Sequence, residues 1–261
     1  MSARRMCRGS PWAIVHCAGV VLAASVVIQP LAAQPAAMRD SATHATPVPI
    51  LAAGFAAGAL AAMPIDARWD GIVGAGGPQG SHFLREADRL GDNWGSPGAI
   101  VAAGTLWLGA RVVHDSVRAR YGARALEALA LSGTITGAIK GIAGRARPYA
   151  DPGQPGSWVI ARGVRDGRYQ SFPSGHATAA FAFASAIASQ LERDRAPIRH
   201  WAGPVLYGLA AVTALSRTYD HDHWASDVIA GAGVGTLSGL VVSRWHDAHR
   251  GSWIDKVLLG R

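Results

Sequence analysis

Cysteine and charge are both scarce in this chain of 261 residues. It has two cysteines, Cys7 and Cys17, so the chain beyond them has no disulfide, no thiol nucleophile and no cysteine metal ligand. Charged residues make up 16% of the chain, against about 25% in average soluble domains. Stretches that alternate polar and apolar residues are also missing, which argues against a β-rich fold. The composition therefore favours an apolar helical bundle, either within a membrane or in solution.

The N-terminus has the features of a secretory signal. A positive start, an apolar stretch and a small-residue cleavage site follow one another, formed by Arg4, Arg5 and Arg8, by residues 12–28 and by residues 31–33. We predict a signal peptide over residues 1–33, with an uncleaved membrane anchor as the alternative. Residues 34–47 are rich in Pro, Thr and Ala and are predicted to be a flexible lead-in. Residues 48–261 are then expected to form a single domain.

Six apolar stretches, each 16–19 residues long, predict helices in that domain. Alanine, glycine, serine and threonine are frequent in them, and such small residues let helices approach closely. Their length is at or below the roughly 17–25 residues of a membrane-spanning helix. We predict an all-α bundle with five or six spanning helices; a soluble periplasmic bundle is the alternative. The stretches are residues 48–65, 98–113, 125–143, 176–191, 201–216 and 227–243.

Loop charges predict how such a bundle would be oriented. The net charge is +8, and basic residues gather after the second and the last apolar stretches. Because cytoplasmic loops are enriched in Lys and Arg, these two loops are expected inside the cell and the remaining motifs outside. That orientation requires one stretch not to span, and we expect residues 48–65, with prolines at both edges, to lie flat. No DNA- or RNA-binding motif is present, so the positive charge does not indicate a nucleic-acid partner.

The first polar block is Lys140-Gly-Ile-Ala-Gly-Arg-Ala-Arg147-Pro148. Lys140 and Arg147 are seven residues apart, close to two helical turns, so we expect both to point the same way at the end of one helix. Pro148 prevents the helix from continuing. Such a pair suits an anion, although a pair of cations at a membrane edge has the same pattern.

The second block, Pro173-Ser174-Gly175-His176, precedes an apolar helix. Ser174 is a candidate N-cap, and the backbone N–H groups after it would point at a bound anion. A capped helix with a surface histidine is the simpler interpretation. A serine nucleophile is disfavoured, because Phe172 stands where a nucleophile elbow has its first glycine.

The third block is Ser216-Arg217 followed by His223 and Asp227. The last two are four residues apart and are expected on one helix face, where the carboxylate can fix the imidazole tautomer. Arg217 offers a planar set of donors that matches phosphate oxygens. The neighbouring Asp220, His221 and Asp222 leave a metal site as an alternative, which nearby cations oppose.

The three blocks together resemble the type 2 phosphatidic acid phosphatase (PAP2) superfamily, which includes bacterial membrane lipid phosphatases, class A acid phosphatases and vanadium haloperoxidases. All three signature motifs of that family occur in order: Lys-x6-Arg-Pro, Pro-Ser-Gly-His and Ser-Arg-x5-His-x3-Asp. The resemblance covers residues 98–245, and residues 1–97 show no comparable match. It implies a helical bundle of the acid phosphatase–haloperoxidase type.

The resemblance also implies residue roles. His223 would be the nucleophile that forms a phosphohistidine, Asp227 would orient it, and His176 would protonate the leaving oxygen. Lys140, Arg147, Ser174, Gly175 and Arg217 would bind the phosphoryl oxygens, so neither a metal nor a cofactor is implied.

The expected function is therefore a metal-independent phosphatase. Its substrate would be a phosphomonoester or pyrophosphate of a lipid, such as phosphatidate, phosphatidylglycerol phosphate or undecaprenyl pyrophosphate. The expected location is the bacterial inner membrane, with the site facing the periplasm. The alternatives are a soluble periplasmic acid phosphatase of broad specificity and a vanadium-dependent haloperoxidase.

Overall fold

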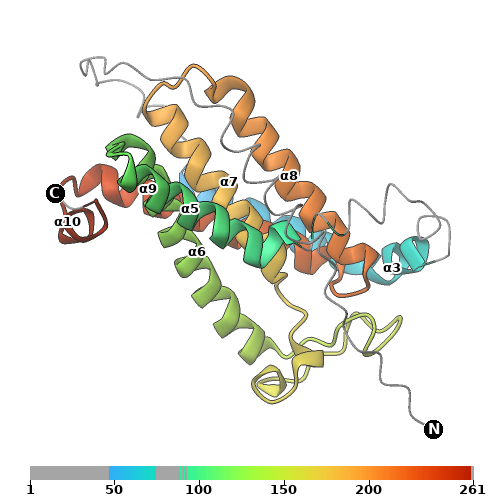
Figure 1. Cartoon of the computed structure of the whole chain (residues 1–261). Helices are drawn as coiled ribbons and strands as arrows, with labels where there is room; N and C mark the ends of the chain where they lie inside the picture. The colour runs from blue at the N-terminus through green and yellow to red at the C-terminus, as the bar shows by residue number, and fades with distance from the viewer. Residues whose placement is uncertain (1–46, 75–88, 90, 92, 260–261) are drawn as a thin grey trace, which may run out of the picture. The chain divides into compact units, whose positions relative to one another are not determined.

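The computed structural model describes residues 47–74, 89, 91 and 93–259, which belong to one compact unit, Thr46–Arg261. The predicted signal at 1–33 and all but the last residue of the lead-in at 34–47 lie outside the described residues. Within the described ranges regular structure is helical, apart from one isolated β-bridge between Arg145 and Trp158 (Figure 1). The elements are α2 (Val48–Ala62), η1 (Met63–Ile65), α3 (Asp66–Gly74), η3 (Trp94–Gly98), α5 (Ala99–Val112), α6 (Ser116–Ala143), η4 (Arg162–Val164), η5 (Gly167–Tyr169), α7 (Gly175–Arg193), α8 (Arg199–Tyr219), α9 (Ala225–Ala248) and α10 (Trp253–Leu259).

Helices α7 and α9 pack closely because α9 presents glycine to its neighbour. A Cβ atom at Gly231 would lie 2.5 Å from the carbonyl oxygen of Ser174, and one at Gly235 would lie 2.2 Å from that of Thr178. No side chain fits at these two positions, so the backbones of the two helices approach closely. The first turns of α7 and α9, which carry the second and third blocks, therefore lie together.

The core between the helices is built mainly from alanine. Small side chains let α5, α6 and α7 interlock, and a few large side chains fill the remaining space. Gly122 of α6 has the same role against α5, since a Cβ atom there would lie 2.3 Å from the backbone nitrogen of Trp107. The largest buried cluster contains Ala99, Ala103, Tyr121, Ala125, Ala128, Leu129, Ala182, Phe183, Ala186, Ile187, Leu191, Ala196, Ala202 and Val242.

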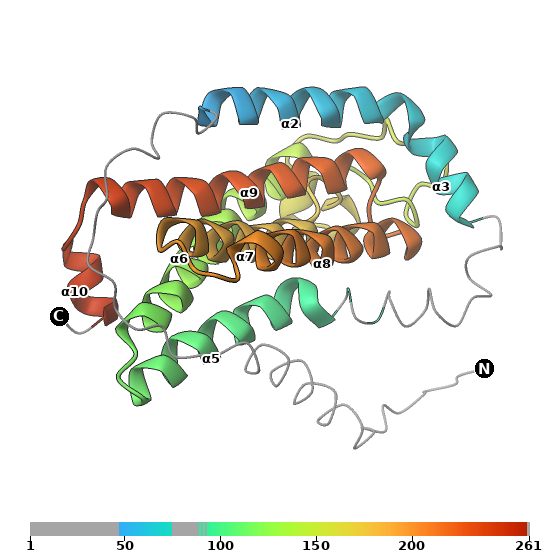
Figure 2. The same cartoon turned by 90° about the horizontal axis from the view of Figure 1, so that it is seen from above.

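Helix α2 runs antiparallel to α9 along its outer side (Figure 2). Phe55 packs on Gly233, and Gly58 lies against Ile229. Residue numbers therefore rise along α2 as they fall along α9, which makes the two helices antiparallel. We expected residues 48–65 to lie flat rather than to span a membrane. In the structure they run alongside α9, where Gly233 leaves room for the ring of Phe55.

Many large apolar side chains remain exposed on the outer helices. On α8, for example, Val205, Leu209 and Val212 recur at helical spacing on one exposed face, and an apolar face of this kind marks a membrane or protein contact. Two stretches among the described residues are long and apolar enough to cross a membrane, Val48–Val73 and Ala225–Ala248. The exposed side chains include Ile50, Leu60, Ile100, Val101, Leu108, Val112, Leu131, Ile135, Val205, Leu209, Val212 and Leu215.

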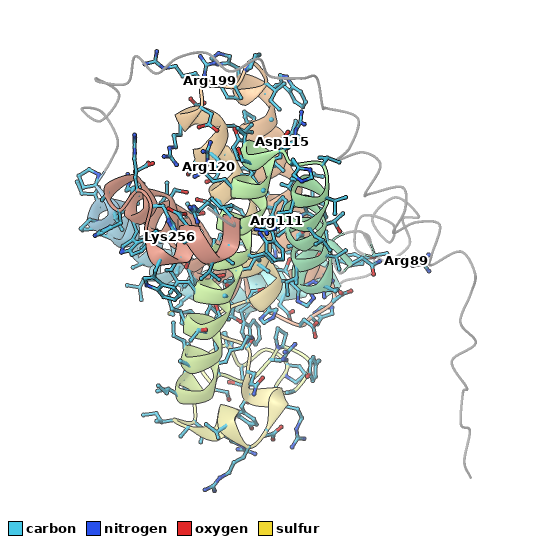
Figure 3. All side chains as sticks on the ribbon, turned by 60° about the vertical axis from the view of Figure 1, so that its left-hand side comes forward. Arg89, Arg111, Asp115, Arg120, Arg199 and Lys256 are labelled. Atoms are coloured by element: carbon cyan, nitrogen blue, oxygen red, sulfur yellow. The ribbon has the colours of Figure 1, made fainter. Side chains whose placement is uncertain are left out.

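The bundle has two chemically different ends. At one end of the bundle, the last turn of α6 lies beside the first turns of α7 and α9 and the last turn of α8. The three sequence blocks lie there. Asp115, Arg120 and Arg199 lie at the other end, away from the loop that joins α6 to α7 (Figure 3). Helix α6 begins nine residues earlier than predicted, because Asp115 caps it by accepting hydrogen bonds from Val117 N and Arg118 N.

Candidate active site

The first block forms the end of α6 and the loop after it. Lys140 lies in the last turn, and the helix stops at Ala143 because Gly144 adopts the left-handed conformation with φ of 59°. A Cβ atom at Gly144 would collide with the carbonyl oxygen of Val159. The expectation that Lys140 and Arg147 share one helix was therefore wrong. Arg147 reaches the same cavity from the loop.

The second block forms the start of α7, as predicted. Ser174 is the N-cap, its Oγ lies 3.5 Å from Ala177 N, and Gly175 and His176 form the first turn. The backbone N–H of Ser174 donates to the carbonyl oxygen of Asp227 at 3.0 Å. This bond joins the second block directly to the third.

The third block spans the end of α8, a short loop and the start of α9. Arg217 lies in the last turn of α8 and is 2% exposed. We expected His223 and Asp227 on one helix face, but α9 begins at Ala225, so His223 precedes the helix and Asp227 lies in its first turn. They are still neighbours, because His223 Nδ1 lies 3.8 Å from Asp227 Oδ2. That distance is beyond hydrogen-bond range.

Burial controls the charge of His223. Its side chain is 3% exposed, and Lys140 and Arg147 are its cationic neighbours. The pKa of His223 is lowered to about 4: desolvation by burial is the largest cause, Lys140 and Arg147 act in the same direction, and Asp227 opposes them. The imidazole is therefore neutral at pH 7 and retains an unprotonated ring nitrogen.

A cavity of about 580 Å³ connects the blocks. Its polar end is lined by Lys140, Arg147, Gly175, His176 and His223. The rest of its wall is mostly apolar and comes from α5, α6 and α7: Ile100, Leu126, Leu129, Ala130, Ser132, Gly133, Thr136, Gly137, Thr178 and Ala179. A charged end and a long apolar wall together suit an amphiphilic molecule with an anionic head.

Three predicted site residues lie behind this lining, namely Ser174, Arg217 and Asp227. Asp222 Oδ1 lies 3.1 Å from Arg147 Nη1, and Asp222 Oδ2 lies 3.5 Å from Arg217 Nη1. Arg217 also pairs with Asp220 at 2.7 Å. The side chains suggested as a metal site thus bind arginines, and His221 pairs with Asp70 at 2.7 Å. No cluster of three or more His, Cys, Asp or Glu suited to a metal occurs among the described residues.

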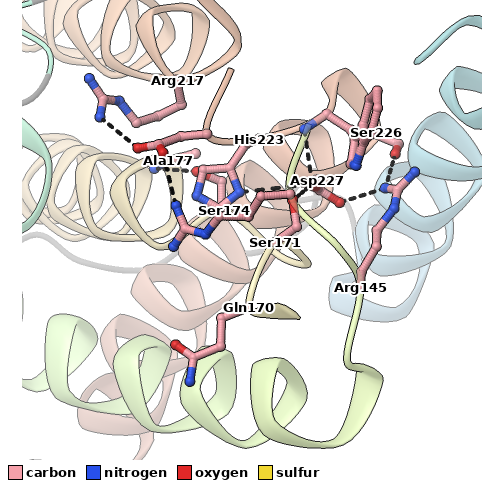
Figure 4. A network of polar contacts seen from close by, with 12 residues as sticks. Arg145, Gln170, Ser171, Ser174, Ala177, Arg217, His223, Ser226 and Asp227 are labelled. Atoms are coloured by element: carbon pink, nitrogen blue, oxygen red, sulfur yellow. Dashed lines mark hydrogen bonds and ion pairs between the residues drawn. The ribbon is translucent and has the colours of Figure 1, made fainter. Parts of the chain in front are cut away.

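Further polar side chains, which the sequence motifs do not indicate, surround Asp227. Figure 4 shows Arg145, Ser171 and Ser226 arranged around this carboxylate. Arg145 Nη1 donates to Asp227 Oδ1 at 2.6 Å, and Ser171 Oγ donates to Oδ2 at 2.5 Å. The backbone N–H of Trp224 donates to Oδ2 at 3.0 Å. Arg145 could have been noticed as a third cation in the first block, whereas Ser171 carries no local signal.

Comparisons with known proteins agree with this geometry. Residues 121–250 match the family model described as the PAP2 superfamily. The fold is similar to the crystal structure of a transmembrane PAP2 type phosphatidylglycerolphosphate phosphatase from Bacillus subtilis, with a TM-score of 0.52 and 21% identity. That match covers 79% of this chain and 94% of the other, and at this identity it supports the fold alone.

Two curated relatives are similar over shorter segments. A lipid A 1-phosphatase of Porphyromonas gingivalis is 42% identical over 26% of this chain and 15% of its own length. A PA-phosphatase related-family protein of Dictyostelium discoideum is 31% identical over 49% of this chain and 49% of its own. The chain thus spans half or less of the curated relatives that it matches. Through residues 121–250, which contain all three sequence blocks, the chain belongs to the PAP2 superfamily.

Proposed function

We propose that this protein is a metal-independent phosphatase that removes a phosphoryl group from a membrane lipid. The cavity carries this proposal, because Lys140, Arg147, His176 and His223 line one end of it and apolar side chains line the rest. Phosphoryl transfer needs positioned donors around three oxygens and an in-line nucleophile. The apolar wall favours a lipid over a small soluble phosphoester, which would leave it empty.

In the first chemical step, Nε2 of His223 attacks phosphorus. The N–P bond forms as the bond from phosphorus to the leaving oxygen breaks, and His176 donates a proton to that oxygen. Nδ1 faces Asp227. The carboxylate can accept a hydrogen bond from Nδ1–H, which keeps the proton on Nδ1 and stabilises the positive imidazole that develops. The 3.8 Å separation must shorten by about 1 Å to give a hydrogen bond, as catalytic contacts often do when substrate binds.

In the second step, water attacks the phosphohistidine. His176, now neutral, takes a proton from this water, the N–P bond breaks, and inorganic phosphate leaves. Lys140, Arg147 and Gly175 line the cavity and would hold the phosphoryl oxygens in both steps, and Arg217 and Ser174, directly behind that lining, would join them once the side chains in front shift on binding. Each such donor is worth about 3 kcal/mol of barrier when it matches the charge of the transition state.

The proposal also gives the bundle an orientation in the bacterial inner membrane, with the site facing the periplasm. Helices α2, α5, α6, α7, α8 and α9 would span. The end away from the site carries a high density of arginine and lysine, as cytoplasmic ends do. These cations are Arg111, Arg118, Arg120, Arg124, Arg244, Arg250 and Lys256.

A substrate panel tests the proposed function. The purified protein, in lipid nanodiscs with a chelator present, is given phosphatidate, phosphatidylglycerol phosphate, undecaprenyl pyrophosphate and p-nitrophenyl phosphate. We expect phosphate release in the presence of chelator, with a higher kcat/KM on at least one lipid than on the aryl phosphate. Equal or better turnover of the aryl phosphate would favour the broad-specificity acid phosphatase. Bromide oxidation on addition of vanadate and hydrogen peroxide, without phosphate release, would favour the haloperoxidase.

A further inference from the structure

Asp66 is a fully buried carboxylate that comes from outside the matched family segment. It begins α3, directly after the short turn η1, and its side chain is 0% exposed. The family match starts at residue 121, so neither the motifs nor the match draws attention to it. A buried carboxylate is costly unless it is paired and hydrogen-bonded, so its partners indicate why it is there.

The hydrogen-bond partners of Asp66, Ser226 and Arg145, lie close to the proposed catalytic residues. Its Oδ1 accepts from the backbone N–H of Ser226 at 2.9 Å. Its Oδ2 accepts from Ser226 Oγ at 2.6 Å and from Arg145 Nη2 at 2.7 Å. Ser226 lies between His223 and Asp227 in the chain, so Asp66 anchors the first turn of α9 at its backbone.

Arg145 links Asp66 to the catalytic carboxylate of Asp227. It is 1% exposed, and its Nη1 donates to Asp227 Oδ1 at 2.6 Å while Nη2 binds Asp66. The carbonyl oxygen of Pro155 accepts from Nη2 at 2.8 Å and from Nε at 3.0 Å. The guanidinium lies 4.8 Å from the ring centroid of Trp158, so its position is fixed on several sides.

The charges of this cluster suit a reaction that makes His223 positive. One guanidinium lies between two carboxylates, which leaves one negative charge among these three buried groups. If Arg145 paired with Asp227 alone, it would neutralise that carboxylate. With Asp66 sharing the guanidinium, Asp227 keeps negative charge for the imidazole, which becomes cationic as the N–P bond forms.

We propose that Asp66 is a positioning residue of the active site: through Arg145 and Ser226 it fixes the Asp227 carboxylate, and through that carboxylate the ring of His223. This proposal rests on the phosphatase function proposed above. It makes helices α2 and α3 a part of the catalytic unit. Asp66 itself does not line the cavity and takes no part in the chemistry.

The test compares Asp66→Asn with Asp70→Asn in full-length protein in nanodiscs. Asp70 lies one turn further along α3 and pairs with His221 in a partly buried bridge, so it is a matched control. We expect Asp66→Asn to lower kcat by about 10-fold to 100-fold, as the loss of a supporting hydrogen-bond partner commonly does, with KM within twofold. Asp70→Asn should keep kcat within about threefold, because a partly exposed ion pair contributes little.

A double variant separates positioning from structural damage. If Asp66 acts through Asp227, then Asp66→Asn combined with Asp227→Asn should be no slower than Asp227→Asn alone. The proposal would be overturned if the loss of kcat in the double variant equalled the product of the two single losses. A wild-type kcat in Asp66→Asn would also overturn it. Inorganic phosphate should bind Asp66→Asn with unchanged affinity, since its proposed ligands remain; lost binding would indicate general damage and contradict the positioning role.

Ser226→Ala gives a second, uncharged test. It removes the hydroxyl that bridges Asp66 and Arg145 but leaves both charges in place. We expect kcat to fall about 3-fold to 10-fold with KM unchanged, which corresponds to the loss of one net hydrogen bond. An unchanged kcat would contradict the proposal. Absence of turnover in the wild-type protein would instead defeat the proposed function, so the two failures are distinguishable.

Discussion

Arg147 and Arg217 share a single carboxylate, that of Asp222. Its Oδ1 lies 3.1 Å from Arg147 Nη1 and its Oδ2 lies 3.5 Å from Arg217 Nη1. The two arginines come from blocks that are seventy positions apart in the chain. One group the size of a carboxylate can therefore bind both of them, and a phosphoryl group offers similar oxygens at similar spacing.

Loss of Arg147 should remove one of these donors from the phosphoryl group. For Arg147→Ala we expect kcat/KM on the best lipid substrate to fall by about 10² to 10³. Arg147→Lys should recover only part of the loss, because lysine lacks the planar pair of donors. The measurement is steady-state phosphate release, with Arg199→Ala at the opposite end of the bundle as the control. A loss within threefold would remove Arg147 from the phosphate site.

Asp222 should compete with phosphate for the two arginines. In Asp222→Asn that competition is weaker, so we expect inorganic phosphate to inhibit at a concentration about threefold lower, an effect typical of a partly exposed ion pair. The inhibition constant for phosphate measures this, and Asp166→Asn, which changes an exposed pair with Arg168, is the control. Weaker inhibition in Asp222→Asn would mean that Asp222 supports the site rather than competing with its ligand.

The acid side of the pH profile should follow His223. Burial lowers its pKa to about 4, so the neutral form that we propose as the nucleophile persists well below pH 6.5. Because kcat/KM reports the free enzyme, its acid limb should have its midpoint near pH 4. A midpoint at or above 6.5 would contradict a buried, neutral nucleophile.

The same shift makes stability depend on pH. The folded pKa lies below the ordinary value of 6.5, so the unfolded chain binds the proton more readily. The contribution of neutral His223 to the free energy of unfolding is fully present above about pH 6.5 and is lost as the pH falls toward about 4. Between these values the melting temperature in detergent should fall by on the order of 5 °C more in the native protein than in His223→Asn. Parallel melting curves for the two proteins would contradict the shift.

The apolar part of the cavity should select for a lipid tail. Gly133 lines it and has no atom within 4 Å of its missing Cβ, so Gly133→Leu would fill the space without a clash at that atom. We expect kcat/KM on dioleoyl phosphatidate to fall about 10-fold or more, while hydrolysis of p-nitrophenyl phosphate stays within twofold. Gly208→Leu is the control, because Gly208 is equally open but does not line the cavity. Equal losses on both substrates would argue against a tail site at Gly133.

Single cysteines test the orientation of the bundle. In a background without Cys7 and Cys17, we expect a membrane-impermeant maleimide to label Arg168→Cys in intact spheroplasts but not His200→Cys. Arg168 is exposed in the loop after α6, and His200 is exposed at the opposite end. Labelling of His200→Cys alone would reverse the proposed orientation.

Pro47→Cys adds a test of the predicted signal peptide. Because α2 runs antiparallel to α9, Pro47 lies toward the end of the bundle away from the site. If all six helices span and the site is periplasmic, Pro47 is cytoplasmic, whereas a chain cleaved after residue 33 would begin in the periplasm. Unlabelled Pro47→Cys would therefore argue against cleavage, and labelled Pro47→Cys would argue that α2 does not cross.

The sequence predicted the helices well where packing and composition agree. Apolar runs located α5, α7 and α9 because their small residues both form helices and interlock. It missed the start of α6, since the stretch from Ser116 to Arg124 is rich in arginine and was interpreted as a loop. Helix α6 ends because Gly144 adopts the left-handed conformation, so Lys140 lies in the helix and Arg147 lies in the loop after it.

The candidate site was predictable only where residues share a local motif. Lys140, Arg147, Gly175, His176 and His223 line one cavity, and each belongs to one of three short patterns. Asp66 was not predictable, because its contact with Arg145 joins residues 79 positions apart and no pattern marks either end of α2 or α3. Long-range ion pairs of this kind depend on how the helices pack, which a single sequence does not specify.

Trapping the phosphorylated protein tests the central claim most directly. The protein is mixed with phosphatidate that carries ³²P in its phosphate, quenched within one turnover and digested. We predict an acid-labile, base-stable label on the peptide that contains His223, and no label and no turnover in His223→Asn. Undiminished turnover in His223→Asn, or rapid turnover without any label on that peptide, would contradict the account.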